Sequence, residues 1–245
     1  MTEQIQTAEQ GYIITLRNVK KEYVVGESHI HALAGVSLSV EPGEFICISG
    51  RSGSGKSTLL NMLAGLENPT SGEIEILGQH IEKLGEAGRI RFRQKHIGFV
   101  FQSYNLMPQY TAVENVELPL TLRGIGPKER RARAMEAMEQ VGIASHAQHK
   151  PSEMSGGQQQ RVGIARALIT QPPIIFADEL TGNLDTKTSN EIMDLLTELF
   201  RERGTTFLLV SHDPDMSRYT DRTIHLLDGR IVSEEKLVGI GERKA

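Results

Sequence analysis

A glycine-rich run near position 50 has the composition and spacing of a loop that binds phosphate groups. The run GRSGSGKS, residues 50–57, follows the apolar stretch FICIS and leads into STLLNMLAGL, which has a helical pattern. Glycines leave backbone N–H groups accessible to an anion, lysine adds a positive charge, and the hydroxyl after it is a ligand for Mg²⁺. The pattern therefore predicts that the chain binds a nucleotide with Mg²⁺. The predicted phosphate-binding residues are Gly50, Arg51, Ser52, Gly53, Ser54, Gly55, Lys56, Ser57 and Thr58.

Three further apolar runs end in polar side chains. IGFVFQ ends in Gln102, PIIFADE ends in Asp178 and Glu179, and TFLLVSH ends in His212. Ligands bind at the carboxyl ends of the strands in parallel sheets, so we expect these side chains at the same edge as the phosphate loop.

This set of side chains suits the transfer of a phosphoryl group to water. Asp178 and Gln102, together with Ser57, are the predicted Mg²⁺ ligands. Glu179 is predicted to activate the attacking water, and Gln102 is also able to reach that water. His212 is predicted to contact the terminal phosphate and to orient the water. Gln102 and His212, each taken alone, also fit ordinary structural roles, Gln102 as a surface or capping residue. The pair Asp178–Glu179 after an apolar run is a stronger signal by itself, because carboxylates in that place rarely lack a cation. The phosphate loop favours the catalytic interpretation of all four.

The run MSGGQQQR, residues 154–161, is a second glycine-rich helix start. Ser155 is suited to cap the helix, and the paired glycines leave backbone N–H groups open to an anion. Because the loop at 50–57 already accounts for one phosphate site, these residues alone do not identify what the second site binds.

Composition excludes several classes of protein. The chain has 245 residues, is 38% hydrophobic and carries a formal net charge of −4, which disfavours a general nucleic-acid binder. The single cysteine, Cys47, lies in an apolar run, which predicts a buried thiol and a reducing compartment. No apolar stretch is long enough to span a membrane, and the polar start of the chain is unlike a signal peptide. We therefore expect a cytoplasmic protein whose membrane association comes through a partner.

The pattern along the chain predicts one domain with three parts. Residues 12–25 and 31–45 alternate apolar and polar positions, as half-exposed antiparallel strands do. Residues 103–165 have a helical period, and Pro127 stands where a helix can begin. Strand patterns return at 173–179 and 205–212, and Asp228–Gly229 is typical of a hairpin turn. The expected organisation is a tail at 1–11, a single domain at 12–235 and a tail at 236–245.

Together these motifs resemble the nucleotide-binding subunits of ATP-binding cassette (ABC) transporters, over about residues 12–235. The phosphate loop resembles the Walker A motif, and IIFADE resembles Walker B. SGGQ resembles the family signature, which other phosphate-loop classes do not use. The matching positions are Gln102 for the Q-loop, Ser155, Gly156, Gly157 and Gln158 for the signature, Asp185 in GNLD for the D-loop, and His212 for the switch histidine.

The resemblance also implies a fold and an adenine contact. The fold class is α/β, a P-loop NTPase core with a mostly parallel sheet, an antiparallel β subdomain and a helical subdomain that bears the signature. Tyr23 matches the aromatic position that stacks on adenine, whereas the residue taken alone would be interpreted as a strand tyrosine packed on a neighbour.

The function implied by the resemblance is Mg²⁺-dependent ATP hydrolysis within a transport complex. In the family the signature of a second copy completes the site around the γ-phosphate, which implies a homodimer. Two membrane permease subunits and an extracytoplasmic adaptor are further partners implied by the branch resembled, which serves lipoprotein release, macrolide or peptide efflux and a division-linked complex. The expected place is the cytoplasmic face of the inner membrane, and no nucleic-acid partner is expected.

Two positions depart from the family pattern, and other functions remain open. Met154 stands where leucine is usual, and Leu180 follows Glu179 where proline is usual, which predicts a looser loop around Glu179. The alternatives are an ABC ATPase in a division-linked or signalling complex without transport, and a soluble ABC ATPase acting on nucleic acid. A third alternative, a small-molecule kinase built on a phosphate loop, lacks support because such a kinase needs neither SGGQ nor the switch histidine.

Overall fold

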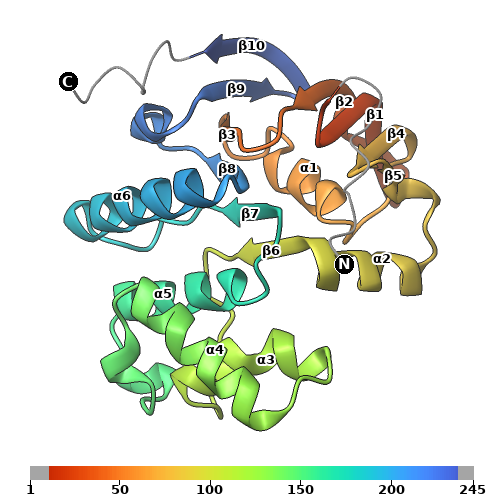
Figure 1. Cartoon of the computed structure of the whole chain (residues 1–245). Helices are drawn as coiled ribbons and strands as arrows, with labels where there is room; N and C mark the ends of the chain where they lie inside the picture. Colours follow the sequence, from red (N-terminus) through yellow and green to blue (C-terminus); the bar gives the residue numbers. More distant parts are fainter. Residues whose placement is uncertain (1–10, 237–245) are drawn as a thin grey trace. The chain divides into compact units, whose positions relative to one another are not determined.

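The computed structural model describes residues 11–236 and divides into two compact units. Unit 1 comprises the chain up to Arg93 and from Gly204 onward, and unit 2 comprises Gln94–Arg203. The helix α2, Glu86–His96, passes from one to the other (Figure 1). The other elements of unit 1 are β1 Ile14–Val25, β2 Ser28–Val40, β3 Phe45–Ser49, α1 Lys56–Leu63, β4 Ser71–Ile76, β5 Gln79–His80, η1 Ile81–Lys83, β8 Thr206–Ser211, η4 Pro214–Tyr219, β9 Arg222–Leu227 and β10 Arg230–Lys236.

An antiparallel sheet in unit 1 has the strand order β2-β1-β4-β5. β1 pairs with β2 from Ile14 opposite Val40 to Val25 opposite Ser28, with register shifts along the way. Apolar side chains such as Leu16 and Val36 are buried, whereas the ends of the strands near the turn are exposed. The half-exposed antiparallel strands predicted from the sequence are confirmed.

The second set of strands in unit 1 carries the phosphate loop. It follows the order β10-β9-β3-β8, and β3 pairs in parallel with both β8 and β9. Phe45 of β3 and Phe207 of β8 meet edge to face with ring centroids 4.6 Å apart, within the buried core. β9 and β10 form the predicted hairpin, and φ is positive at both Asp228 (46°) and Gly229 (72°), as a type I′ turn requires.

Unit 2 combines two parallel strands with a set of helices. Its elements are β6 Ile97–Val100, α3 Ala112–Leu122, α4 Pro127–Gln140, η2 Ala144–His146, η3 Pro151–Glu153, α5 Gly156–Leu168, β7 Ile174–Asp178 and α6 Thr186–Arg203. β6 pairs with β7, and α3, α4 and α5 pack on one another (Figure 1). The predicted helical region is confirmed, including the start of α4 at Pro127.

The architecture is the α/β class predicted from the sequence, with mostly parallel strands, an antiparallel sheet and a helical part that bears the signature. Within residues 11–236, no helix combines the length and the apolar character needed to cross a membrane. The domain limits stay a prediction. The two predicted tails lie outside the described residues, apart from Gly11 and Lys236.

Candidate functional site

The phosphate loop lies between β3 and α1 in unit 1, packed tightly against neighbouring backbone. A Cβ at Gly50 would stand 2.3 Å from the Leu226 carbonyl oxygen, and a Cβ at Gly55 would stand 2.3 Å from the Ala32 carbonyl oxygen. Gly55 is the N-cap of α1 with φ of 101°, and no side chain caps the helix. Glycine is therefore required at both positions, and the start of α1 keeps backbone N–H groups for an anion.

Two buried polar groups of the loop fit a phosphate ligand. Lys56 is 5% exposed, and its Nζ donates to the carbonyl oxygens of Gly50 and Arg51, each at 2.9 Å. The Ser54 hydroxyl is buried and has no hydrogen-bond partner among the described residues. An ammonium has three donors, so Lys56 can hold the loop closed and still donate to a phosphate.

His212 follows the strand that neighbours the phosphate loop. Ser49 at the end of β3 pairs with Ser211 at the end of β8, and the two strands are parallel. The residues that follow, Gly50 and His212, therefore leave the sheet at the same edge. The His212 side chain is exposed, in keeping with a residue that contacts a ligand there.

Tyr23, the predicted adenine contact, lies beside the first turn of α1. Its hydroxyl donates to Glu67 Oε2 at 2.8 Å, and the Lys21 ammonium lies 5.0 Å from its ring centroid. Burial raises the pKa of the Tyr23 phenol, the hydrogen bond with Glu67 raises it further, and a hydrogen bond with Thr58 opposes the shift. Because Thr58 belongs to α1, the ring is held next to the helix that starts at the phosphate loop.

Gln102, Asp178 and Glu179 come together in unit 2. Val100 of β6 pairs with Ala177 of β7 in parallel, so the residues after both strands leave at one edge. A Cβ at Gly182 would stand 3.0 Å from Gln102 Nε2 and 3.7 Å from Glu179 Oε2. The amide and the carboxylate therefore flank the same small space, as a pair that positions one water requires.

The segment after Glu179 is held by local hydrogen bonds. Gly182 N–H donates to the Glu179 carbonyl at 3.0 Å, and Asn183 Nδ2 donates to the Gln102 carbonyl at 3.1 Å. Asp185 accepts from Thr188 N–H at 3.0 Å and from Thr188 Oγ1 at 2.7 Å, which lowers the pKa of the Asp185 carboxyl. The predicted D-loop residue thus caps the start of α6.

Ser155 caps the signature helix, as the sequence predicts. Its Oγ accepts from Gln158 N–H at 3.3 Å, and its own N–H donates to Gln158 Oε1 at 2.9 Å. Gln158 Nε2 then faces His146 Nε2 at 3.0 Å, where the imidazole nitrogen must accept because an amide N–H₂ only donates. The cap uses the serine oxygen as an acceptor and leaves its hydroxyl proton to donate to a ligand.

Both signature glycines are confined by side chains of their own chain. A Cβ at Gly156 would stand 2.8 Å from the Tyr104 hydroxyl, and a Cβ at Gly157 would stand 2.7 Å from Thr188 Cγ2. Tyr104 belongs to the loop after Gln102, and Thr188 follows Asp185. Sequence reasoning missed Tyr104 and Thr188, because neither residue type signals a close approach to a helix far away in the chain.

The predicted residues thus gather in two sets, one in each unit. Unit 1 holds the phosphate loop with Tyr23 and His212, and unit 2 holds the acidic strand end, Gln102, Asp185 and the signature.

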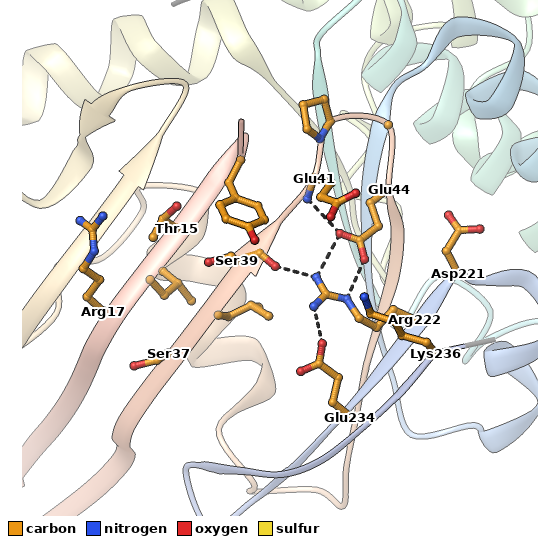
Figure 2. A pocket seen from close by; sticks show the side chains of 15 residues that line it. Thr15, Arg17, Ser37, Ser39, Glu41, Glu44, Asp221, Arg222, Glu234 and Lys236 are labelled. Carbon is orange, nitrogen blue, oxygen red and sulfur yellow. Dashed lines mark hydrogen bonds and ion pairs between the residues drawn. The ribbon is translucent and has the colours of Figure 1, made fainter. Parts of the chain in front are cut away.

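A separate cavity of unit 1, about 860 Å³ in volume, contains none of the predicted site residues. Figure 2 shows Arg222 within it, donating to the Ser39 carbonyl at 2.6 Å and paired with Glu44 at 2.6 Å and with Glu234. Burial alone would lower the pKa of Arg222, but Glu234 and Glu44 together raise it. Because the network joins β2, β9 and β10, we infer that it stabilises the packing of these strands.

The sequence model of the ABC transporter family matches residues 33–182. MJ0796 of Methanocaldococcus jannaschii, an uncharacterized ABC transporter ATP-binding protein, is 48% identical over 94% of this chain and 100% of its own length. The lipoprotein-releasing system ATP-binding protein LolD of Geobacter metallireducens is 44% identical over 91% of this chain and 99% of its own length.

The solved structures similar to this chain include a dimer. A dimeric, post-hydrolysis structure of MJ0796 bound to ADP and Pi has a TM-score of 0.87 and 47% identity, covering 92% of this chain and 99% of that one. The structure of cbiO1 from Clostridium perfringens, part of the transporter complex cbiONQ, has a TM-score of 0.83 and 30% identity, covering 93% and 89%.

Proposed function

The chain belongs to the ABC transporter family, and from this premise we propose that it drives membrane subunits through ATP-dependent closure of its own homodimer. It is an ATP-binding cassette and an ATP hydrolase of this family. The observation that carries the proposal is the second anion-binding helix start, at Ser155, in a chain that already has a complete phosphate loop.

Residues of unit 1 are proposed to bind ATP. The start of α1 and the loop N–H groups bind the phosphates, and Lys56 directs its third donor to the terminal phosphates while holding two loop carbonyls. Tyr23 stacks on the adenine, supported by its position beside α1.

Mg²⁺ is the proposed cofactor, with Ser57, Asp178 and Gln102 as its ligands or the ligands of its waters. Mg²⁺ usually binds one or two side chains plus phosphates, so the lack of a larger cluster of metal-ligating side chains in residues 11–236 agrees with it. When bound, it would neutralise the charge of the phosphates. Glu179 is proposed to accept the proton of the attacking water, and His212 to orient that water at the terminal phosphate.

The signature is proposed to complete the site of a partner subunit. Ser155 retains its hydroxyl proton, and the N–H groups at the start of α5 have no carbonyl partner within the helix, as at any helix N-terminus. The dimeric ADP- and Pi-bound structure of MJ0796 supports this arrangement. Mixing Ser155→Arg subunits with Lys56→Ala subunits should restore one working site per mixed dimer, and a mixture without activity would contradict action in trans.

The membrane partners are proposed to contact the loop NLMPQY, residues 105–110. Asn115 is fully buried and bonds Met107 N–H at 2.7 Å and the carbonyls of Met107, Tyr110 and Thr111 at 3.0–3.3 Å. These bonds hold the Met107 and Tyr110 side chains outward, with exposed fractions of 45% and 39%. Exposed apolar side chains on a hydrogen-bonded loop suit packing against a helix of a membrane subunit. The contact would place the chain at the cytoplasmic face of the inner membrane.

The transported substrate is proposed to be a drug or peptide exported from the cell, or a lipoprotein released from the membrane. Similarity to LolD supports the second. The extracytoplasmic adaptor stays a prediction, and so does the alternative of a division-linked or signalling complex. Affinity purification from a detergent extract tests the membrane partner: a membrane subunit with a large outer domain supports a complex of this branch, and ribosomes or DNA support the nucleic-acid alternative.

The experiment that tests the catalytic assignment is Glu179→Gln. The variant should keep ATP affinity and lose hydrolysis by about 10²-fold or more, because the base that activates water is lost. It should also accumulate as an ATP-bound dimer in light scattering. Lys56→Ala is the matched control, since it should lose ATP affinity and dimer together. Near-normal turnover of Glu179→Gln would remove Glu179 from this role.

A further inference from the structure

Tyr104 lies lengthwise along the signature helix. Its hydroxyl is 2.8 Å from where a Cβ of Gly156 would stand, and its carbonyl oxygen is 3.8 Å from where a Cβ of Gly163 would stand. The two glycines are seven positions apart on α5, so they share one face two turns apart, about 10 Å along the axis. Together they form the shallow channel in which the tyrosine lies.

The loop that carries Tyr104 also carries Gln102. Arg166 of α5 donates to the Tyr104 carbonyl at 2.6 Å, and Asn183 Nδ2 donates to the Gln102 carbonyl at 3.1 Å. Tyr104 has φ of 58°, in the left-handed region that a bulky residue rarely occupies. The surroundings therefore fix the loop in one strained arrangement against the helix.

We propose that Tyr104 is a positioning residue that joins the loop of Gln102 to the signature of the same chain. Glycine is needed at position 156 because a side chain there would collide with the Tyr104 hydroxyl. The inference rests on the proposed function, in which Gln102 serves the chain's own nucleotide and the signature serves the partner's. A movement of Gln102 on ATP binding is then transmitted through Tyr104 to Ser155 and Gly157. The two ATP sites of the dimer are coupled through this contact.

The geometry predicts a specific pattern of rescue. The Cβ of alanine at position 156 would stand 2.8 Å from the Tyr104 hydroxyl oxygen, which is closer than Cβ atoms come to other atoms in real proteins. Without that hydroxyl, the nearest atoms are Leu184 Cδ2 at 3.5 Å and Tyr104 Cζ at 3.7 Å, which are ordinary contacts. Alanine is otherwise favoured over glycine in a helix, so the hydroxyl alone accounts for the expected defect.

The test is a double-mutant cycle of Tyr104→Phe and Gly156→Ala, with Gly157→Ala as the control. Each protein is measured for its thermal midpoint without nucleotide, its half-saturating ATP concentration and its Hill coefficient for hydrolysis. We expect Gly156→Ala to raise half-saturating ATP by about tenfold or more, a change of about 1.4 kcal/mol, and to bring the Hill coefficient toward one. The double variant should return to the behaviour of Tyr104→Phe.

The control separates this contact from a general need for glycine. Gly157→Ala meets Thr188 Cγ2, so Tyr104→Phe should not rescue it. A double variant as impaired as Gly156→Ala alone would overturn the proposal. If wild-type protein forms no ATP-dependent dimer, the proposed function fails, and the thermal cycle still decides the contact, because it needs no nucleotide. Additive thermal effects of the two changes would overturn the contact itself.

Discussion

Arg166 is predicted to hold the Gln102 loop in its strained arrangement. Its Nη1 and Nη2 donate to the carbonyls of Asn105 and Tyr104, each at 2.6 Å, and burial lowers the pKa of its guanidinium. The two residues that it holds have φ of 47° and 58°. Non-glycine residues in the left-handed region cost on the order of 1–3 kcal/mol each, less for asparagine.

The prediction depends on how the free energy of the two Arg166 hydrogen bonds compares with the backbone strain of the loop. Hydrogen bonds to a charged group contribute about 1.5–3 kcal/mol each, so the pair at Arg166 offsets a strain of similar magnitude. Arg166→Met removes both bonds, and the loop then relaxes instead of remaining strained. Arg166→Lys keeps the charge but has no planar fork, so it should retain one bond and give an intermediate result. The free energy of global unfolding should change less than the free energy of opening the loop, because relaxation of the loop releases its backbone strain.

Hydrogen exchange followed by mass spectrometry measures how easily the Gln102 loop opens in each variant. Peptides covering residues 101–107 should exchange about 10²-fold faster in Arg166→Met, because a loss of about 2.7 kcal/mol in local opening energy corresponds to that factor. ATP hydrolysis should fall while ATP affinity, set by the phosphate loop, stays within about threefold.

Arg161 provides the matched control on the same helix. It donates to one carbonyl, that of Val141, at 2.8 Å, outside the Gln102 loop. Arg161→Met should leave exchange at 101–107 unchanged. Equal exchange in Arg166→Met and wild-type protein would refute the reasoning that the two hydrogen bonds maintain the strained loop.

Three further predictions concern groups whose surroundings are well defined. Burial raises the pKa of the Cys47 thiol to about 12, so a thiol reagent at pH 8 should label it only after unfolding in urea; equal labelling rates would contradict burial. Thr188→Val removes a donor to Asp185, so the Asp185 pKa, now lowered, should rise toward its usual value in an NMR titration. The stabilisation from Asp185 is present above the unfolded-state pKa and is lost as pH falls through the folded-state pKa, and the variant should show a smaller loss. Arg222→Met should lower the free energy of unfolding by about 1–3 kcal/mol, because it leaves the Glu44 carboxylate, which is 14% exposed, without its arginine partner. Arg17→Met, from an exposed pair, should cost less than about 1 kcal/mol in the same urea titration.

The features of the fold that the sequence predicts are those that depend on residues close together in the chain. The start of α4 at Pro127 and the turn at Asp228 follow from the backbone preferences of proline, aspartate and glycine, and both are confirmed. The strand ends are predictable because a buried run that stops at a polar residue is a local signal. Pairing of β3 with β8 then brings His212 to the edge that carries the phosphate loop, and pairing of β6 with β7 brings Gln102 to the edge that carries Asp178 and Glu179.

Contacts between distant segments were not predictable from these patterns. Arg222 and Glu44 are 178 positions apart, and Tyr104 and Gly156 are 52 positions apart in the numbering. A single arginine or tyrosine fits many surroundings, so its partner is known only once the chain is folded. The glycines of the signature show the same limit: their sequence pattern indicates open N–H groups, and the structure adds that side chains of the same chain confine them.

Leu180 shows how the fold compensates for a departure from the family pattern. Glu179 has φ of 42°, and a proline at 180 would disfavour a helical conformation in the residue before it, so leucine permits this geometry. Leu180 is 2% exposed, and Gly182 N–H binds the Glu179 carbonyl at 3.0 Å. Burying a leucine side chain contributes about 1.5–3 kcal/mol, so Leu180 itself helps to hold the segment after Glu179 in place. The looser loop predicted from the sequence stays a prediction, which hydrogen exchange of this segment in the wild-type protein and in Leu180→Pro would test.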